Sequence, residues 1–257
     1  MNGVHIEDRG GARWVTLDRP DCRNALEPAV LASLTEGVTT AGDARVIVLA
    51  GAGGAFCSGA DLRYAASQGP DLLERVDEHL ANFQDLIRAV LRAPQPVVAS
   101  VDGAAYGFGC DLALAADLRV ASTRAYFQEG FVRIGLIPDG GGTWMLPRLV
   151  GLSKALELAL LGEKLDAAEA QRLGLVARLC EPSELAAVTQ AVVDKLVGSA
   201  PMALARIKRL MRAGLDTDFA TAFSSEGKAQ AECLRSEDCM EGVAAFLQKR
   251  PAQFQGK

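Results

Sequence analysis

The sequence predicts an α/β fold that is followed by a helical C-terminal region. Two observations support this prediction. Apolar strands alternate with glycine-rich turns and helices in the first half of the chain, and the pattern becomes helical almost to the end after Ile137-Pro138. With 257 residues, 49% of them hydrophobic, the chain can bury one large core and carry a small appended module.

The N-terminal elements follow from hydrophobic periodicity. Residues 4–7 and 13–17 are predicted to form a β-hairpin around Gly10-Gly11. Residues 27–40 carry apolar side chains at helical spacing, and Gly42 is placed to end that helix. A long amphipathic helix over residues 72–91 ends before Pro94, because the residue that precedes a proline disfavours the helical conformation.

Two apolar strands each lead into a glycine-rich turn. Residues 45–50 precede the turn at 51–62, and residues 96–101 precede the turn at 102–111. Glycines permit tight backbone geometry where a helix is about to begin, and a helix N-terminus presents unpaired N–H groups and partial positive charge. Two such ends aimed at one point predict an oxyanion hole for a carbonyl oxygen that gains negative charge.

The second half of the chain is predicted to be mostly helical. Helical patterns cover residues 154–161, 167–173, 184–197, 202–213 and 241–249, with a short strand at 175–179. No linker rich in proline or serine interrupts the sequence. We therefore expect a core over residues 1–200 and a helical region over residues 201–257.

Composition excludes several classes of protein. The formal charge of −5 argues against nucleic acid as the main partner. No apolar run is long enough to span a bilayer, and the N-terminus lacks a signal-peptide core, so a cytoplasmic protein without membrane contact is expected. Six cysteines without a C-x-x-C pair predict neither a disulfide framework nor a metal site.

Three tempting motifs have plainer interpretations. Gly51-Ala52-Gly53 follows a strand, but Phe56 occupies the third glycine position of a dinucleotide-binding motif. Cys57 is expected to be a small buried hydrophobe, and His79 a solvated or half-buried residue, rather than a nucleophile and its base. The basic stretch at 206–212 is expected to be a solvated face or a contact between subunits.

Five segments, in order along nearly the whole chain, resemble the enoyl-CoA hydratase/isomerase (crotonase) superfamily. They are Arg23-Asn24-Ala25-Leu26, the turn at 51–62, Gly107-Phe108-Gly109-Cys110-Asp111 with the residues that follow to 117, the segment 134–143 around Ile137-Pro138-Asp139, and the closing segment 241–250. The segments at 134–139 and 143–151 are most similar to those of phenylacetate-pathway enoyl-CoA isomerases.

The resemblance implies a crotonase-like spiral of ββα units and a C-terminal helical region that builds a homotrimer or a hexamer, which is a dimer of trimers. It implies an acyl-CoA thioester substrate, with coenzyme A as part of the substrate and no separate cofactor or metal. The backbone N–H groups of Ser58 and Phe108 are the oxyanion donors that it implies. The backbone N–H of Phe108 is retained although many relatives have glycine there, and its side chain must then point away from the thioester.

The carboxylates favour one chemistry over two others. Where hydratases of the family use two glutamates, this chain has Asp111 and Phe131, and phenylalanine cannot transfer a proton. Asp139 stands where isomerases of the family carry an aspartate, although it could instead be a helix N-cap. We therefore expect a double-bond shift in an enoyl-CoA, with Asp139 as the base and Asp111 assisting or relaying. A hydratase that uses both aspartates and a non-catalytic coenzyme A-binding protein are the alternatives.

The resemblance also places the coenzyme A contacts. Those on the same chain are Arg23, Ala25, Leu26, Ser58, Ala60, Asp61 and Leu62. Phe246 and Lys249 match residues of the C-terminal region that reach the nucleotide portion, in relatives from a neighbouring subunit. Candidate walls of the acyl pocket are Tyr64, Phe131, Trp144 and Met145.

Overall fold

A six-stranded sheet and a three-stranded sheet form the centre of the protein. The computed structural model describes residues 3–70 and 74–257. The larger sheet has the order β1-β2-β3-β4-β6-β9, with β1 and β2 antiparallel and all later pairs parallel. Its strands are β1 (Val4–Arg9), β2 (Ala12–Leu17), β3 (Val46–Gly51), β4 (Val97–Val101), β6 (Leu118–Ser122) and β9 (Arg178–Cys180). The smaller sheet has the order β5-β7-β8 and consists of β5 (Ala104–Tyr106), β7 (Tyr126–Gln128) and β8 (Leu165–Asp166).

Helices lie on both faces of the larger sheet. The helices of the described chain are α1 (Pro28–Thr39), α2 (Leu62–Ser67), α4 (Val76–Arg92), α5 (Phe108–Ala115), α6 (Gly142–Val150), α7 (Leu152–Leu161), α8 (Ala167–Arg172), α9 (Leu185–Val197), α10 (Pro201–Gly214), α11 (Phe219–Leu234) and α12 (Glu237–Gln248), and not all of them lie on this sheet. Because side chains alternate along a strand, Ile47 and Leu49 of β3 join the core with α1, α4 and α5. Val46 and Val48 face the opposite way and pack with α9. The two-sided burial explains the continuous apolar runs of the parallel strands.

Most of the elements expected from the sequence are confirmed. The hairpin at β1 and β2 and the helices α1, α7, α8, α9, α10 and α12 lie where periodicity placed them, to within a few residues. The expected start of the long helix at residue 72 falls among residues 71–73, outside the described residues, and α4 begins at Val76. The expected strand at 175–179 is displaced, since β9 covers Arg178–Cys180 and Leu175 is buried in the core after α8. Helix α11 was not predicted, because its sequence is rich in small and polar residues.

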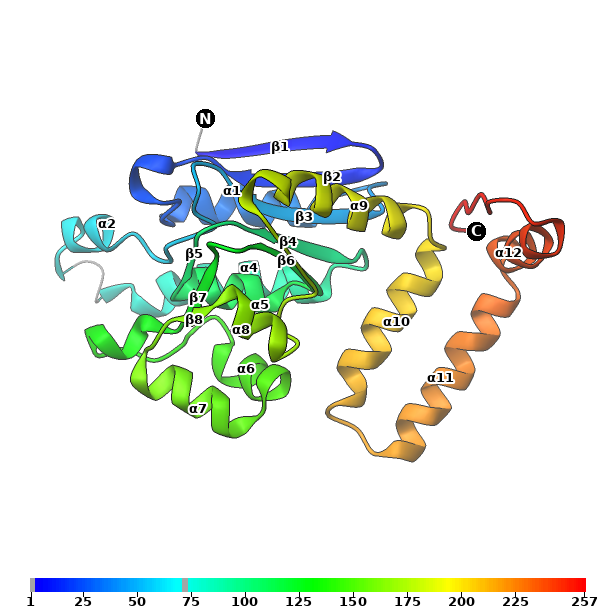
Figure 1. Ribbon diagram of the computed structural model, residues 1–257. Coiled ribbons are helices and arrows are strands. Elements are labelled where there is room, and N and C mark those ends of the chain that lie inside the picture. Colours follow the sequence, from blue (N-terminus) through cyan, green and yellow to red (C-terminus); the bar gives the residue numbers. More distant parts are fainter. Residues whose placement is uncertain (1–2, 71–73) are drawn as a thin grey trace.

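The C-terminal helices extend away from the sheets. Figure 1 shows α10 and α11 as a helical hairpin beside the core, with α12 at its far end. Large apolar side chains on these helices are exposed, among them Ile207, Met211, Phe223, Phe246 and Leu247. Phe246 is 83% exposed. This region therefore carries an apolar surface that the chain itself does not cover.

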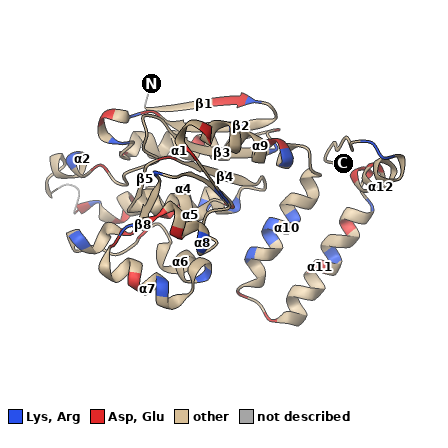
Figure 2. Cartoon of the chain, viewed as in Figure 1, with Lys and Arg blue, Asp and Glu red and all other residues tan. Residues whose placement is uncertain are grey.

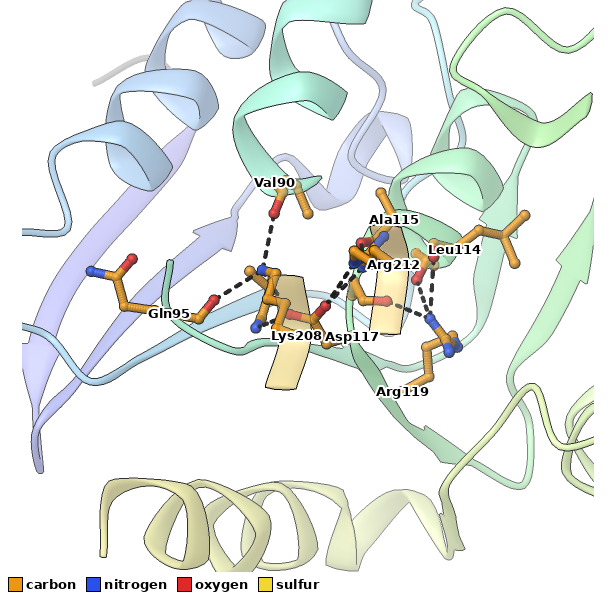
Figure 3. Close-up of polar contacts among 11 residues, drawn as sticks. Val90, Gln95, Leu114, Ala115, Asp117, Arg119, Lys208 and Arg212 are labelled. Carbon is orange, nitrogen blue, oxygen red and sulfur yellow. Dashed lines mark hydrogen bonds and ion pairs between the residues drawn. The ribbon is translucent and has the colours of Figure 1, made fainter. Parts of the chain in front are cut away.

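Basic side chains of α10 fasten this helix to the core, which is a correction to the expectation of a solvated or intersubunit face. Figure 2 shows lysines and arginines along α10. The nearly buried Lys208 donates to the carbonyls of Val90 (3.3 Å) and Gln95 (2.9 Å) and pairs with Asp117 (2.8 Å). Arg212 donates to the same Asp117 carboxylate at 2.7 Å (Figure 3). The aspartate thus joins α10 to the end of α5.

No helix in the described part of the chain is both long enough and apolar enough to cross a membrane.

Candidate active site

Two chain turns that are far apart in sequence are held side by side at the site. The buried Asn24 donates to the carbonyls of Ala52 (3.0 Å) and Ala55 (2.7 Å), which ties the segment 23–26 to the glycine-rich turn at 51–62. Leu26 and Ala60 form a parallel bridge. The segments predicted to contact coenzyme A, residues 23–26 and 58–62, are therefore adjacent, as the resemblance requires.

The amide of Ser58 is a poor candidate for an oxyanion donor. Its N–H donates to the Arg23 carbonyl at 3.0 Å, and a backbone N–H supplies one donor. The amides of Ala60 and Phe108 have no hydrogen-bond acceptor among the described residues. The prediction for Ser58 is therefore corrected by two positions, to Ala60, while Phe108 keeps its predicted role as a candidate.

Gly59 lets the two candidate amides come close together. It adopts φ +85°, and a Cβ there would lie 2.8 Å from the carbonyl oxygen of Tyr106 and 3.2 Å from the amide nitrogen of Phe108. Phe108 opens α5 after Gly107, so its N–H is one of the unpaired donors of a helix N-terminus. Its ring is buried and packs edge to face on Phe83, with 4.7 Å between centroids, as expected for a side chain that points into the core.

Asp111 is buried within the first turn of α5. Its Oδ2 accepts from the Gly140 amide at 2.9 Å, while Oδ1 has no partner among the described residues. Burial raises the pKa of Asp111 well above its ordinary value, the charge of Glu129 raises it further, and the amides of Gly140 and Gly142 lower it. Asp111 therefore braces the glycine turn before α6 and resists ionisation.

Asp139 lies half-buried in that turn and does not cap α6. The helix begins at Gly142 with Gly141 as its N-cap and has no side-chain cap, so the alternative role of Asp139 as an N-cap is wrong. Its Oδ1 is buried without a partner in the described chain. Burial raises the pKa of Asp139, while its own backbone amide and the charge of His79 lower it. A carboxyl whose pKa is raised is a stronger base when ionised than an ordinary aspartate, as a group that takes a proton from carbon must be.

Glu129 is a third carboxyl that sequence reasoning missed. It follows β7, is 2% exposed, and both of its carboxyl oxygens are buried without a hydrogen bond to any described residue. Burial raises its pKa to about 7; the neighbouring Cys110 and Asp111 side chains lower it and the charge of Asp139 raises it. The signal in the sequence is a charged residue directly after the short strand β7, two positions before Phe131.

The remaining predicted contacts are placed as follows. Arg23 is exposed, Ala25 and Leu26 are buried, and Leu62 is 56% exposed. Asp61 is the N-cap of α2 and accepts from the Arg63 and Tyr64 amides, so it has a structural role whether or not it contacts a ligand. Phe246 and Lys249 belong to the end of α12, across the view from α2 in Figure 1, so one chain does not bring them to this site.

Of the four candidate walls of the acyl pocket, Phe131 and Tyr64 lie near the Phe108 amide or Asp139. Phe131 is buried against Gly107, and Tyr64 lines a hollow of about 220 Å³ together with His79, whose charge acts on Asp139. Met145 is buried in the core. Trp144 lines a separate hollow between α6 and α10, so its role as a wall of the acyl pocket stays a prediction.

Cys57 is not a nucleophile. Its side chain is fully buried, and burial raises the pKa of the thiol to about 12. His79 packs on Phe83 instead, with 5.1 Å between ring centroids. What remains is a pair of amides that have no acceptor in the described part of the chain, beside carboxyls of raised pKa. That is the arrangement of an acid–base enzyme acting on a carbonyl compound.

Comparison with known proteins identifies the group of enzymes. The enoyl-CoA hydratase/isomerase family matches residues 7–257, and the chain belongs to this family. It is 41% identical to a probable enoyl-CoA hydratase of Rhodobacter capsulatus, over 99% of this chain and 98% of that protein. It is 35% identical to the 1,2-epoxyphenylacetyl-CoA isomerase of Escherichia coli, over 98% and 97% of the two chains. The crystal structure of an enoyl-CoA hydratase from Polaromonas sp. JS666 superposes with a TM-score of 0.94 at 32% identity, covering 98% of this chain and 99% of that one. The fold is accordingly the crotonase fold, and the protein is an enzyme of the hydratase/isomerase type.

Proposed function

We propose that the enzyme shifts a double bond in an enoyl-CoA through a thioester enolate. The observation that carries this proposal is Asp139, a half-buried carboxyl of raised pKa that makes no helix cap. In the first step the Asp139 carboxylate takes a proton from carbon, and the C–H electrons move into the thioester to form the enolate. In the second step the enolate collapses as a proton returns to a different carbon.

The enolate oxygen is to be held by the amides of Ala60 and Phe108. Both lack an acceptor in the described chain, and the Gly59 turn brings them together. Preorganised donors of this kind stabilise developing negative charge without reorganisation during the reaction. The chemistry needs only proton transfer, so we propose no separate cofactor and no metal.

We further propose that coenzyme A lies along the paired turns at 23–26 and 58–62, with the exposed Arg23 near its phosphates. The apolar surface on α10–α12 is then the contact that builds a trimer or a hexamer, in which Phe246 and Lys249 complete a neighbour's site. The six cysteines are all free, which supports a location in the reducing cytoplasm.

Hydration of a 2-enoyl-CoA is the second candidate. It is favoured by Glu129, which places a second buried carboxyl beside Asp111 and so offsets the phenylalanine at position 131. Two carboxyls can position and activate a water that adds to the double bond.

Absorbance of the conjugated enoyl thioester separates the candidates. Isomerisation of a 3-enoyl-CoA creates this absorbance, hydration of crotonyl-CoA removes it, and a protein that only binds coenzyme A changes neither. We expect the purified protein to act on the 3-enoyl substrate. Bleaching of crotonyl-CoA without action on the 3-enoyl substrate would establish the hydratase instead.

A further inference from the structure

The mechanism above leaves one buried carboxyl unexplained. Glu129 has both oxygens buried, and no described residue bonds to them. The preceding Gln128 has a clear structural use, since its amide donates to the Gly162 carbonyl at 2.7 Å. An unpartnered carboxyl in a protein interior costs free energy, so its retention in this place calls for a partner or a function.

Asp111 and Glu129 border the same small space next to Gly142. A Cβ built on Gly142 would lie 2.2 Å from Asp111 Oδ1 and 3.2 Å from Glu129 Oε1. These oxygens both lack a partner among the described residues. Two ionised carboxylates side by side in a buried space would repel and lose hydration, whereas one proton held between them gives each oxygen a hydrogen bond.

Among the residues that the structure describes, no cationic side chain neutralises the pair. Cys110, which is on α5, lies beside Glu129. Asp139, in the turn before α6, adds a negative charge near the pair. His79 on α4 acts on Asp139. Arg119 is electrostatically coupled to Cys110, but its buried guanidinium is bonded to the backbone carbonyls of residues 113, 114, 116 and 175. The other side chains around Glu129, from α6, α7 and β8, are leucines at 146, 158 and 165.

We propose that Glu129 is a positioning residue that shares one proton with Asp111, and that this pair is the acid that completes the double-bond shift. Asp139 takes a proton from one carbon, Asp111 gives the shared proton to the other carbon as the enolate collapses, and the proton on Asp139 then passes to the pair. The sequence of transfers returns all three carboxyls to their starting state. This inference rests on the proposed isomerase function.

Infrared spectroscopy of the full-length protein tests the shared proton without requiring turnover. We expect a carbonyl band of a protonated carboxyl near pH 7, which persists in Asp139→Asn. In Glu129→Gln the midpoint pH at which this band disappears should fall by about one unit or more, because the glutamine amide donates to Asp111 and favours its ionised form. Glu163→Gln is the matched control, since this exposed glutamate changes the same charge away from the site. An absent band in the wild type, or an unchanged midpoint in Glu129→Gln, would overturn the proposal.

Kinetics supply the second readout. In Glu129→Gln we expect kcat on the 3-enoyl substrate to fall about 10- to 100-fold with KM changed less than about threefold, and the alkaline limb of its pH profile to move to lower pH. An unchanged profile would contradict the shared proton. If Glu129→Gln does not fold, Asp111→Asn takes its place: the midpoint of the band left by Glu129 must fall by about one unit or more, because the asparagine amide donates to Glu129 and favours its ionised form. If the wild type does not isomerise at all, the proposed function fails, while the infrared titration still decides whether the proton is shared.

Discussion

Replacing Glu129 by glutamine should make the protein more stable at alkaline pH. The glutamate has an ordinary pKa of 4.5 and a pKa of about 7 in the folded protein, because burial disfavours its charge. The folded state therefore binds more protons than the unfolded state between these values. Stability from this group is fully present below pH 4.5 and is lost as the pH rises towards 7.

The size of the effect follows from the same two values. At about 1.4 kcal/mol for each pH unit of separation, the ionised side chain costs the folded state about 3 kcal/mol above pH 7. Glutamine has nearly the same shape and no charge to bury, so Glu129→Gln escapes this cost. The amide can donate to Asp111, and the free energy of this one hydrogen bond is a smaller contribution than the burial of the Glu129 charge.

The assay is urea unfolding of wild type and Glu129→Gln at pH 5 and pH 8, at one fixed protein concentration because the chain is expected to assemble. Relative to the wild type, the variant should gain about 2–3 kcal/mol in free energy of unfolding between the two pH values. Glu163→Gln should show no such gain. An equal difference between variant and wild type at pH 5 and pH 8 would refute the reasoning, since it would mean that Glu129 ionises as freely in the folded protein as in the unfolded chain.

Three further outcomes are expected. Asp139→Asn should lower turnover by about 10²–10⁴-fold and leave coenzyme A affinity within a few-fold, as measured by steady-state kinetics and calorimetry; near-normal turnover would remove Asp139 from the chemistry. A crystal structure with an acyl-CoA analogue should place the thioester oxygen within hydrogen-bond distance of the amides of Ala60 and Phe108, and an oxygen bound to the Ser58 amide would reverse our assignment. Sedimentation should show a trimer or hexamer for the intact chain, and truncation after Gly198 should abolish both assembly and tight coenzyme A binding; an active monomer at micromolar concentration would disprove the role of the C-terminal helices.

The positions of the turns could be predicted from the sequence because glycines and apolar strands mark them directly. Which amide of the turn at 51–62 is the candidate oxyanion donor could not be predicted. Ser58 and Ala60 are two residues apart, and what separates them is whether the backbone N–H is already hydrogen-bonded. That difference depends on the Arg23 carbonyl, 35 residues earlier in the chain, which bonds Ser58 at 3.0 Å. Asp111 and Asp139 were found through their motifs.

Glu129 and Lys208 show a second limit of prediction from the sequence. Sequence patterns treat a charge as solvated unless a motif claims it, because buried charges are rare. Glu129 is buried among side chains of α5, α6, α7 and β8, and Lys208 is nearly buried where α10 meets α4 and the residues before β4. Both burials arise from contacts between distant segments, so neither leaves a local signature.

The absence of a side chain at Gly142 has a consequence for how this enzyme could diversify. Even a methyl group there would collide with Asp111 Oδ1, so this position is closed to substitution unless the carboxyl pair moves. The segment just before it is different: Ile134, Leu136 and Ile137 are more than half exposed in the single chain. The carboxyl proposed to move protons, Asp139, and these exposed apolar side chains thus lie within ten positions of one another. A substitution at these exposed positions can alter the outer surface of the segment without adding an atom next to the carboxyl pair.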